Sequence, residues 1–207
     1  GCSGRRRVGY DVGVQKVKEN NMVLQNNKEK KEFVITVFSE NKVGLLGQIT
    51  SIFTYHDVNI ESLTTSESAI AGIHKFTIVV CENPDKVERM VKQVEKRVDI
   101  LKAFVYEPED VVMQEIALYK VALHKNVEQL VRQYQLRILE ISDDYIVIEK
   151  TGHKNETAAL FEELKPYGVY QFVRSGQIAV VKSRRELLDE YLQQMNELKA
   201  KLEANNK

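Results

Sequence analysis

The stretch SENKVGLLGQITSIFTYHDVNIESL, Ser39 to Leu63, decides the fold of this chain. It opens with a polar turn that contains Gly44. The apolar residues that follow have the three-and-four spacing that gives a helix one buried face: Leu45, Leu46, Ile49, Ile52 and Phe53. The helix is predicted to end near His56, and a strand then begins with Val58, Ile60 and Leu63. Either Ser39 or Asn41 is placed to cap the helix.

The flanking residues complete a unit of six elements. A run rich in aromatic and β-branched residues, Phe33–Phe38, predicts a strand before the turn. A third strand is marked by alternation of Phe76, Ile78 and Val80. Pro84 opens a second helix, and Ile100–Tyr106 gives a fourth strand. The order β-α-β-β-α-β predicts a ferredoxin-like unit, in which two helices cover one face of a four-stranded antiparallel sheet.

The same order of elements repeats in the second half of the chain. A linker around Pro108, residues 108–114, separates the repeats. The predicted strands are Glu115–Leu123, Arg137–Ile141, Tyr145–Glu149 and Val169–Val173, with helices near 127–134 and 158–164 and an edge strand at Gln177–Val181. The fold class is therefore α+β, with two tandem ferredoxin-like domains at residues 32–107 and 115–182.

The two ends of the chain have different predictions. Residues 1–31 include Arg5–Arg7 but have no hydrophobic periodicity, so they are predicted to be a disordered leader. Residues 183–207 are predicted to form an amphipathic helix, with an apolar stripe of Leu188, Tyr191, Met195, Leu198 and Leu202. Because that repeat spans only about two heptads, packing on the second domain or on a partner is favoured over a coiled coil.

Composition narrows the class of partner. The 207 residues include 30 basic and 30 acidic residues, so no net field attracts nucleic acid or an anionic membrane. The predicted third strand, IHKFTIVV, has one aromatic residue, unlike the RNA-binding modules that share this fold. No apolar run is long enough to span a membrane. Two isolated cysteines, Cys2 and Cys81, predict a reducing compartment without a disulfide framework, so the protein is predicted to be cytoplasmic.

The sequence offers no set of residues for catalysis. The four histidines fall in different elements, without a neighbouring ligand at the spacing of a metal site. No nucleophile elbow, phosphate-binding loop or dinucleotide fingerprint is present. Cys81, in an apolar strand, is interpreted as a packing residue. The chain is therefore predicted to have no catalytic residue and no metal or cofactor of its own.

The turn before the first helix is the best candidate for ligand binding. A helix N-terminus presents unpaired N–H groups and a positive dipole end, which suit a carboxylate, and Gly44 allows close approach to the backbone. Asn41 and Asn59 can together bind the ammonium and carboxylate of an amino acid. Leu45, Leu46 and Ile60 offer an apolar wall for its side chain. The alternative is that Gly44, Asn41 and Asn59 serve only as turn and cap residues.

The chain resembles the small regulatory subunits of acetolactate synthase (acetohydroxyacid synthase). Their ACT domain opens with an E-N-x-x-G-x-L turn, which is Glu40–Leu46 here, and later has N-I-E-S-L, which is Asn59–Leu63. The resemblance continues through EIALYKV at Glu115–Val121 to VRSG at Val173–Gly176. It covers about residues 33–181.

This resemblance implies a non-catalytic subunit of branched-chain amino-acid biosynthesis. Such subunits activate a large catalytic subunit that carries thiamine diphosphate, Mg and FAD, and they confer feedback inhibition by valine or a related amino acid. Their ACT domains form a homodimer, with the effector between the first turn of one chain and the second strand of the other. The implied effector-binding residues are Asn41, Val43, Gly44, Leu45, Leu46, Asn59 and Ile60.

Some positions depart from the family pattern. Gly47 and Gln48 replace a common serine and arginine, and Asp57 replaces a glycine. Since aspartate tolerates a left-handed backbone better than most residues, the bend at Asp57 is predicted to persist. The alternative function is a stand-alone amino-acid-sensing ACT module that acts on a different partner.

Overall fold

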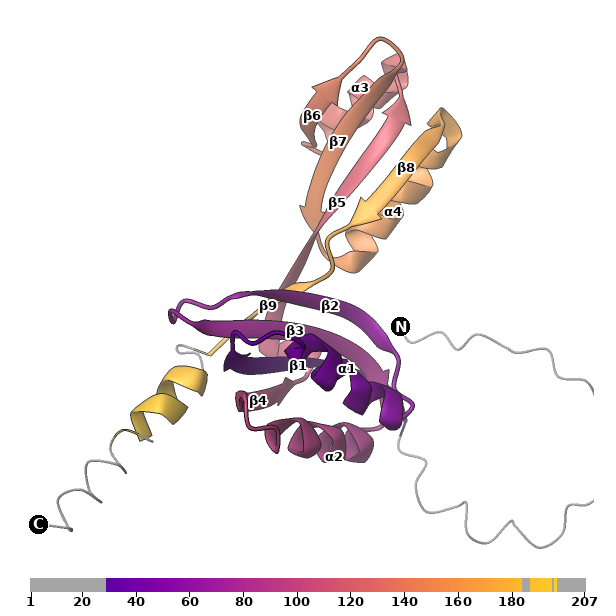
Figure 1. Cartoon of the computed structure of the whole chain (residues 1–207). Helices are drawn as coiled ribbons and strands as arrows, with labels where there is room; N and C mark the ends of the chain where they lie inside the picture. The colour runs from indigo at the N-terminus through magenta and orange to yellow at the C-terminus, as the bar shows by residue number, and fades with distance from the viewer. Residues whose placement is uncertain (1–28, 184–186, 195, 197–207) are drawn as a thin grey trace, which may run out of the picture.

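The computed structural model describes residues 29–183, 187–194 and 196, and it consists of two α+β units joined through extended strands (Figure 1). The first unit has the sheet order β2-β3-β1-β4 and the second the order β6-β7-β5-β8, with antiparallel pairing throughout. Both are the ferredoxin-like arrangement. The predicted tandem fold is confirmed.

The helices and strands have these bounds. The first unit comprises β1 (Lys31–Glu40), α1 (Leu45–Tyr55), β2 (Ile60–Glu67), β3 (Ile73–Glu82), α2 (Pro84–Glu95) and β4 (Ile100–Tyr106). The second comprises β5 (Val111–Ala122), α3 (Lys125–Gln133), β6 (Arg137–Ile141), β7 (Tyr145–Gly152), α4 (Lys154–Leu164) and β8 (Val169–Arg174). A short strand, β9 (Ile178–Val181), and two 3-10 turns, Pro108–Asp110 and Lys165–Tyr167, complete the described elements.

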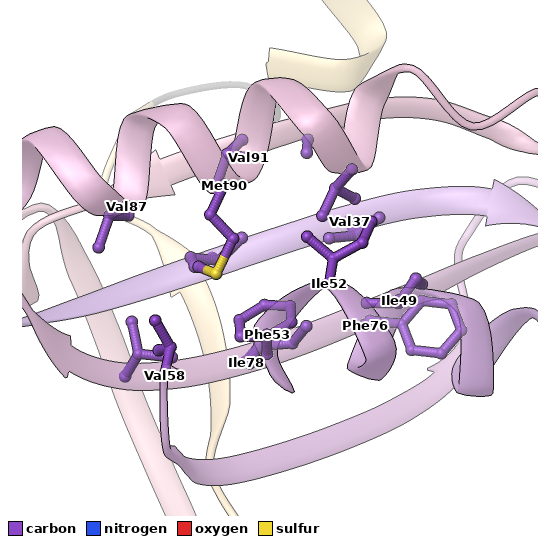
Figure 2. Close-up of a cluster of buried hydrophobic side chains, with 14 of the residues drawn as sticks. Val37, Ile49, Ile52, Phe53, Val58, Phe76, Ile78, Val87, Met90 and Val91 are labelled. Carbon is purple, nitrogen blue, oxygen red and sulfur yellow. The ribbon is translucent and has the colours of Figure 1, made fainter. Parts of the chain in front are cut away.

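The core of the first unit lies between its sheet and its two helices (Figure 2). Alternate residues of β1 point toward the helices, as expected for a strand with period two. They meet the apolar stripe of α1, where Ile49, Ile52 and Phe53 are buried, and that of α2, where Met90 is buried. The three-and-four spacing in the opening stretch therefore does form the buried face of a helix, except that Leu46 of the predicted stripe is exposed.

The opposite face of the first sheet is also covered. Residues 111–114 of β5 pair with β9, and this two-stranded ribbon packs across the sheet. Its buried cluster joins the sheet to the ribbon through Val34, Val79, Tyr106, Val111 and Ala179. Residues 111–114 are thus part of a strand, whereas the predicted linker was residues 108–114. The connection itself is the 3-10 turn Pro108–Asp110.

The C-terminal helix contacts the first unit. Residues 187–194 are helical, Leu187 packs against the cluster under the ribbon, and Leu188 is 1% exposed. The ammonium of Lys102 on β4 lies 5.8 Å from the centre of the Tyr191 ring. Packing on the second domain or a partner was predicted, and packing on the first domain is observed. Met195, Leu198 and Leu202 lie outside the described residues.

Two helices end in the same way, which reflects the internal repeat. Asp57 after α1 has φ 50° and Gln135 after α3 has φ 51°. The next N–H in each case bonds back over the last turn, from Val58 to Phe53 at 2.9 Å and from Leu136 to Val131 at 2.9 Å. This is the Schellman pattern of a helix C-terminus. The prediction of a left-handed bend at Asp57 is confirmed.

Three further predictions concern the termini, the cysteines and the membrane. Residues 1–28 of the predicted leader lie outside the described residues, and Lys31 already belongs to β1. Cys81 is half-buried on β3, and Cys2 lies outside the described residues. Among the described residues, no helix is both long and apolar enough to cross a membrane.

Candidate functional site

The turn that leads into α1 is built around Gly44. This residue has φ +82° and no atom within 4 Å of the position where a Cβ would lie. No side chain caps the helix. The prediction that Ser39 or Asn41 caps it was wrong, because the buried Ser39 hydroxyl donates to the carbonyl of Glu40 at 3.0 Å and Asn41 is exposed to solvent. The N–H of Leu45 bonds back to the carbonyl of Lys42 at 3.4 Å. The next N–H groups of the first turn, those of Leu46 and Gly47, have no side-chain acceptor.

The other three helices of the two α+β units, α2, α3 and α4, are capped locally. Asn83 accepts the N–H of Asp85 at 2.9 Å to cap α2. His124 Nδ1 accepts the N–H of Asn126 at 3.2 Å at the start of α3. Glu156 accepts the N–H of His153 at 2.7 Å at the start of α4. Capping satisfies N–H groups that a helix leaves unpaired, so α1 differs in leaving this anion-attracting end open.

Lys42 anchors the turn and was not identified from the sequence. Its ammonium pairs with the carboxylate of Asp99 and lies 3.1 Å from Glu40 Oε2. The hydrogen bond to Asp99, with a further one to Glu40, raises the pKa of Lys42. The N–H of Glu40 also bonds the carbonyl of Asp99 at 3.1 Å. Because Asp99 is 57 residues away, no local pattern signals this contact.

The apolar residues of the turn have different environments. Val43 is fully exposed and Leu46 is 42% exposed, so both side chains are available to a ligand or a second chain. Leu45 is 2% exposed and packs in the core with α2 and the sheet. The prediction that the Leu45 side chain forms a wall of the pocket was therefore wrong. Only the backbone of Leu45 lies at the turn.

The second group of predicted residues begins β2. The bend at Asp57 is held by Lys86 of α2, whose ammonium donates to the Asp57 carbonyl at 3.1 Å. Asn59 is exposed, and its amide donates to the carboxylate of Glu61 at 2.9 Å. Ile60 is half-buried against the core. The Asn59 side chain thus follows the bend that Lys86 holds, and it reaches solvent.

The two groups lie at opposite ends of α1. The helix has 11 residues, so the rise of an α-helix separates its ends by about 16 Å. We name Asn41, Val43, Gly44 and Leu46 the N-terminal half-site, and Asn59 and Ile60 the C-terminal half-site. A free amino acid is too short to touch both half-sites of one chain. The structure therefore does not bring Asn41 and Asn59 together within a single molecule.

Buried carboxylates elsewhere in the described region have structural partners. Glu82 is bound by the ammoniums of Lys30 and Lys86 at 3.0 and 3.1 Å. Glu115 accepts from the Thr157 hydroxyl at 2.5 Å and faces Arg174 at 3.5 Å. Within the described residues, no group of three metal-ligating side chains occurs. The half-sites at the two ends of α1 remain the best candidate for ligand binding.

Comparison with known proteins gives consistent matches to both units. A family model described as an AHAS small subunit-like ACT domain matches residues 35–102. A second model, described as the small subunit of acetolactate synthase, matches residues 114–183. The two models thus match most of the first domain and nearly all of the second.

Individual relatives agree with the models. The acetolactate synthase small subunit of Bacillus subtilis is 33% identical over 158 residues, covering 74% of this chain and 92% of that protein. The small subunit from Aquifex aeolicus is 30% identical over 162 residues, covering 76% and 83%. The crystal structure of the Thermotoga maritima small subunit is 27% identical, with a TM-score of 0.70 over 75% of this chain and 99% of that chain. The chain therefore belongs to the acetolactate synthase small-subunit family, and its first unit is an ACT domain.

Proposed function

We propose that this chain is the non-catalytic regulatory subunit of an acetolactate synthase. It binds and activates the large catalytic subunit and confers feedback inhibition by valine or a related branched-chain amino acid. The observation that carries the proposal is the N-terminus of α1, where Gly44 is left-handed and no side chain occupies the N–H groups. Family membership makes an amino-acid effector the ligand to test there.

The half-sites have the chemistry that an amino acid requires. The open N–H groups and the positive end of the α1 dipole favour the carboxylate. The amide oxygen of Asn41 or Asn59 can accept from the ammonium. The exposed side chains of Val43 and Leu46 suit a branched aliphatic side chain. Any chemistry on pyruvate belongs to the large subunit, which is proposed to carry thiamine diphosphate, Mg and FAD.

A second copy of the chain completes the site in this proposal. β2 lies at the edge of the first sheet, so one side of its backbone has no neighbouring strand among the described residues. Two ACT domains side by side place the N-terminal half-site of one protomer against the C-terminal half-site of the other. Two-fold symmetry then gives two equivalent sites per dimer. The separation of the half-sites along α1 supports a shared site.

The proposal is tested with Gly44→Asp in the reconstituted enzyme. The new carboxylate would occupy the space proposed for the carboxylate of valine, so valine inhibition is lost while activation is retained. Gly72→Asp is the matched control, because Gly72 also has a left-handed φ, of +78°, and open space at its Cβ. Gly72 lies in the turn between β2 and β3, so the reconstituted enzyme with Gly72→Asp should be inhibited by valine as the wild type is.

Two outcomes would change the proposal. An unchanged valine titration curve for Gly44→Asp would exclude this pocket as the effector site. If the wild-type chain fails to capture or activate an acetolactate synthase large subunit, the alternative of an amino-acid-sensing ACT module with another partner replaces it. Carboligation measured with and without the chain, in the presence and absence of valine, separates these results.

A further inference from the structure

The turn between β8 and β9, Ser175–Gln177, contacts the strand that begins at the C-terminal half-site. The N–H of Gln177 donates to the hydroxyl of Ser62 on β2 at 2.7 Å. The hydroxyl of Thr64, also on β2, donates to the carbonyl of Gln177 at 2.9 Å. Gln177 is 6% exposed. Both backbone groups of Gln177 are thus bound by β2, and we name Ser62, Thr64, Gly176 and Gln177 the clasp.

Gly176 allows the close approach within the clasp. Its φ is +80°, and a Cβ there would lie 3.0 Å from Thr64 Cγ2 and 3.2 Å from Ser62 Oγ. The left-handed turn at Gly168 is less crowded, because a Cβ there would be 3.6 Å from Ala122 Cβ. Glycine is the residue that tolerates both a positive φ and such proximity. The clasp is therefore tight enough for movement of β2 to displace the turn.

The other side of the turn is bound to the second domain. Ser175 exchanges two hydrogen bonds with Ile116 of β5, at 3.0 and 2.9 Å. The neighbouring Arg174 faces the buried carboxylate of Glu115, which in turn accepts from Thr157 of α4. The turn consequently joins β2 of the ACT domain to β5 and α4 of the second domain by short polar contacts.

β2 has one irregular point between the half-site and the clasp. Its pairing with β3 shifts register between Ile60 and Ser62. Such an irregularity locally interrupts the ladder of hydrogen bonds, and β2 is held by a strand on one side only. The backbone between Ile60 and Ser62 therefore has fewer ladder contacts than β1 and β3, which have a strand on each side. It can shift slightly while Lys86 holds the preceding bend at Asp57.

We propose that the clasp transmits occupancy of the effector site to the second domain, an inference that rests on the proposed function. Contact of the effector with Asn59 and Ile60 shifts the start of β2, and Ser62 and Thr64 move Gln177 with it. The turn then shifts β5 and β8, which carry the second sheet. A ligand changes this equilibrium only through unequal affinity for the two positions of β2. The clasp residues act on inhibition through the turn and do not touch the effector.

Ser62→Ala tests the inference, because it removes the acceptor of the Gln177 N–H and adds no bulk. Valine binding to the full chain is measured by calorimetry, and valine inhibition is measured with the large subunit. We expect the affinity of the full chain for valine to stay within about twofold of the wild type. Maximal valine inhibition of the large subunit should fall about fivefold or more, which is the lower end of the usual factors for coupling between two sites. Faster hydrogen exchange at the Gln177 amide would accompany this loss.

Two matched variants serve as controls. Ser66→Ala makes the same change on β2 beyond the clasp, at an exposed position, and should behave as the wild type. Thr64→Val removes the second hydroxyl of the clasp at nearly constant volume, and Thr65→Val is its exposed counterpart on the same strand. Thr64→Val should reproduce the loss of inhibition with retained binding, and Thr65→Val should not.

The outcomes separate the clasp from the effector site. Normal inhibition by both Ser62→Ala and Thr64→Val overturns the inference. Parallel loss of binding and inhibition also overturns it, because the clasp would then only shape the site. A wild-type chain that neither binds valine nor inhibits with it contradicts the proposed function as well. Failure of the proposed function is therefore seen in measurements on the wild-type chain. Failure of the clasp inference alone is seen only in measurements on the variants.

Discussion

The ammonium of Lys86 joins the bend at Asp57 to the base of α2, donating to the Asp57 carbonyl at 3.1 Å. The same ammonium lies 3.1 Å from the buried carboxylate of Glu82. One side chain thus fixes the backbone immediately before Asn59 and neutralises a buried charge. The C-terminal half-site owes its position to a helix that contributes no residue to it.

Lys86→Met should therefore affect both stability and regulation. Loss of the charged partner of Glu82 is expected to lower the free energy of unfolding by about 1–3 kcal/mol. The loosened bend should raise the valine concentration for half-inhibition by about fivefold, within the usual range of coupling effects. Lys92→Met, which breaks only an exposed pair with Glu88, should change stability by less than about 0.5 kcal/mol. Equal effects of the two substitutions in urea unfolding and inhibition assays would contradict this role.

The two glycines of the turn should respond oppositely to alanine. Gly47 lies in the first turn of α1 with open space at its Cβ, so Gly47→Ala is expected to stabilise the chain by about 0.5–1 kcal/mol. Gly44 has φ +82°, and Gly44→Ala should destabilise it by about 1–2 kcal/mol because of the left-handed backbone. Urea unfolding of both variants is the measurement, and a stabilising effect of Gly44→Ala would contradict the assigned conformation.

Glu82 should make the stability of the chain sensitive to acid. Burial acts to raise its pKa, but the N–H of Asn83 and the ammoniums of Lys30 and Lys86 outweigh burial and hold the pKa below its ordinary value of 4.5. A carboxyl whose pKa is lower in the folded state stabilises the fold above the unfolded pKa. That stability is lost as the pH falls from about 4.5 through the lowered pKa of the folded state.

The comparison of wild type with Glu82→Gln isolates this effect. Between neutral pH and the acid range, the free energy of unfolding of the wild type should fall more steeply than that of the variant. Glu88→Gln, at an exposed ion pair, should leave the pH dependence unchanged. Superimposable pH profiles for wild type and Glu82→Gln would show that the carboxylate has an ordinary pKa.

Much of the fold could be predicted because its signals are local. The apolar spacing from Leu45 to Phe53 gives the buried face of α1, and the aspartate at position 57 keeps the left-handed bend. The repeat of six elements then follows from strand alternation and the turn residues. These features depend on neighbours within a few positions in the chain.

The predictions that were wrong or incomplete depend on distant residues. Residues 111–114 were predicted to be part of a linker. In the structure they form a strand, because they pair with β9, which lies more than 60 residues later in the chain. The pairing of Lys42 with Asp99 and the contact of Gln177 with Ser62 also join distant segments. Leu45 was assigned to the pocket because it adjoins Gly44, but the helix turns its side chain toward the core. Sequence spacing alone does not determine such contacts.

The central claim is that two half-sites from different chains form one effector site. Gly44→Asp and Asn59→Ala chains should each lose valine binding when tested alone, the first completely and the second in part. In an equal mixture, a dimer containing one chain of each kind has one site with both substitutions and one site with neither. Random exchange in a two-fold dimer should therefore restore about one quarter of the wild-type number of full-affinity sites.

Equilibrium dialysis of radiolabelled valine against the re-equilibrated mixture is the most direct test. The account predicts a class of sites with wild-type affinity that neither variant shows by itself, at about one quarter of the wild-type number. Binding equal to the average of the two separate variants, with no such class, would show that each chain binds its effector alone and would contradict the shared site.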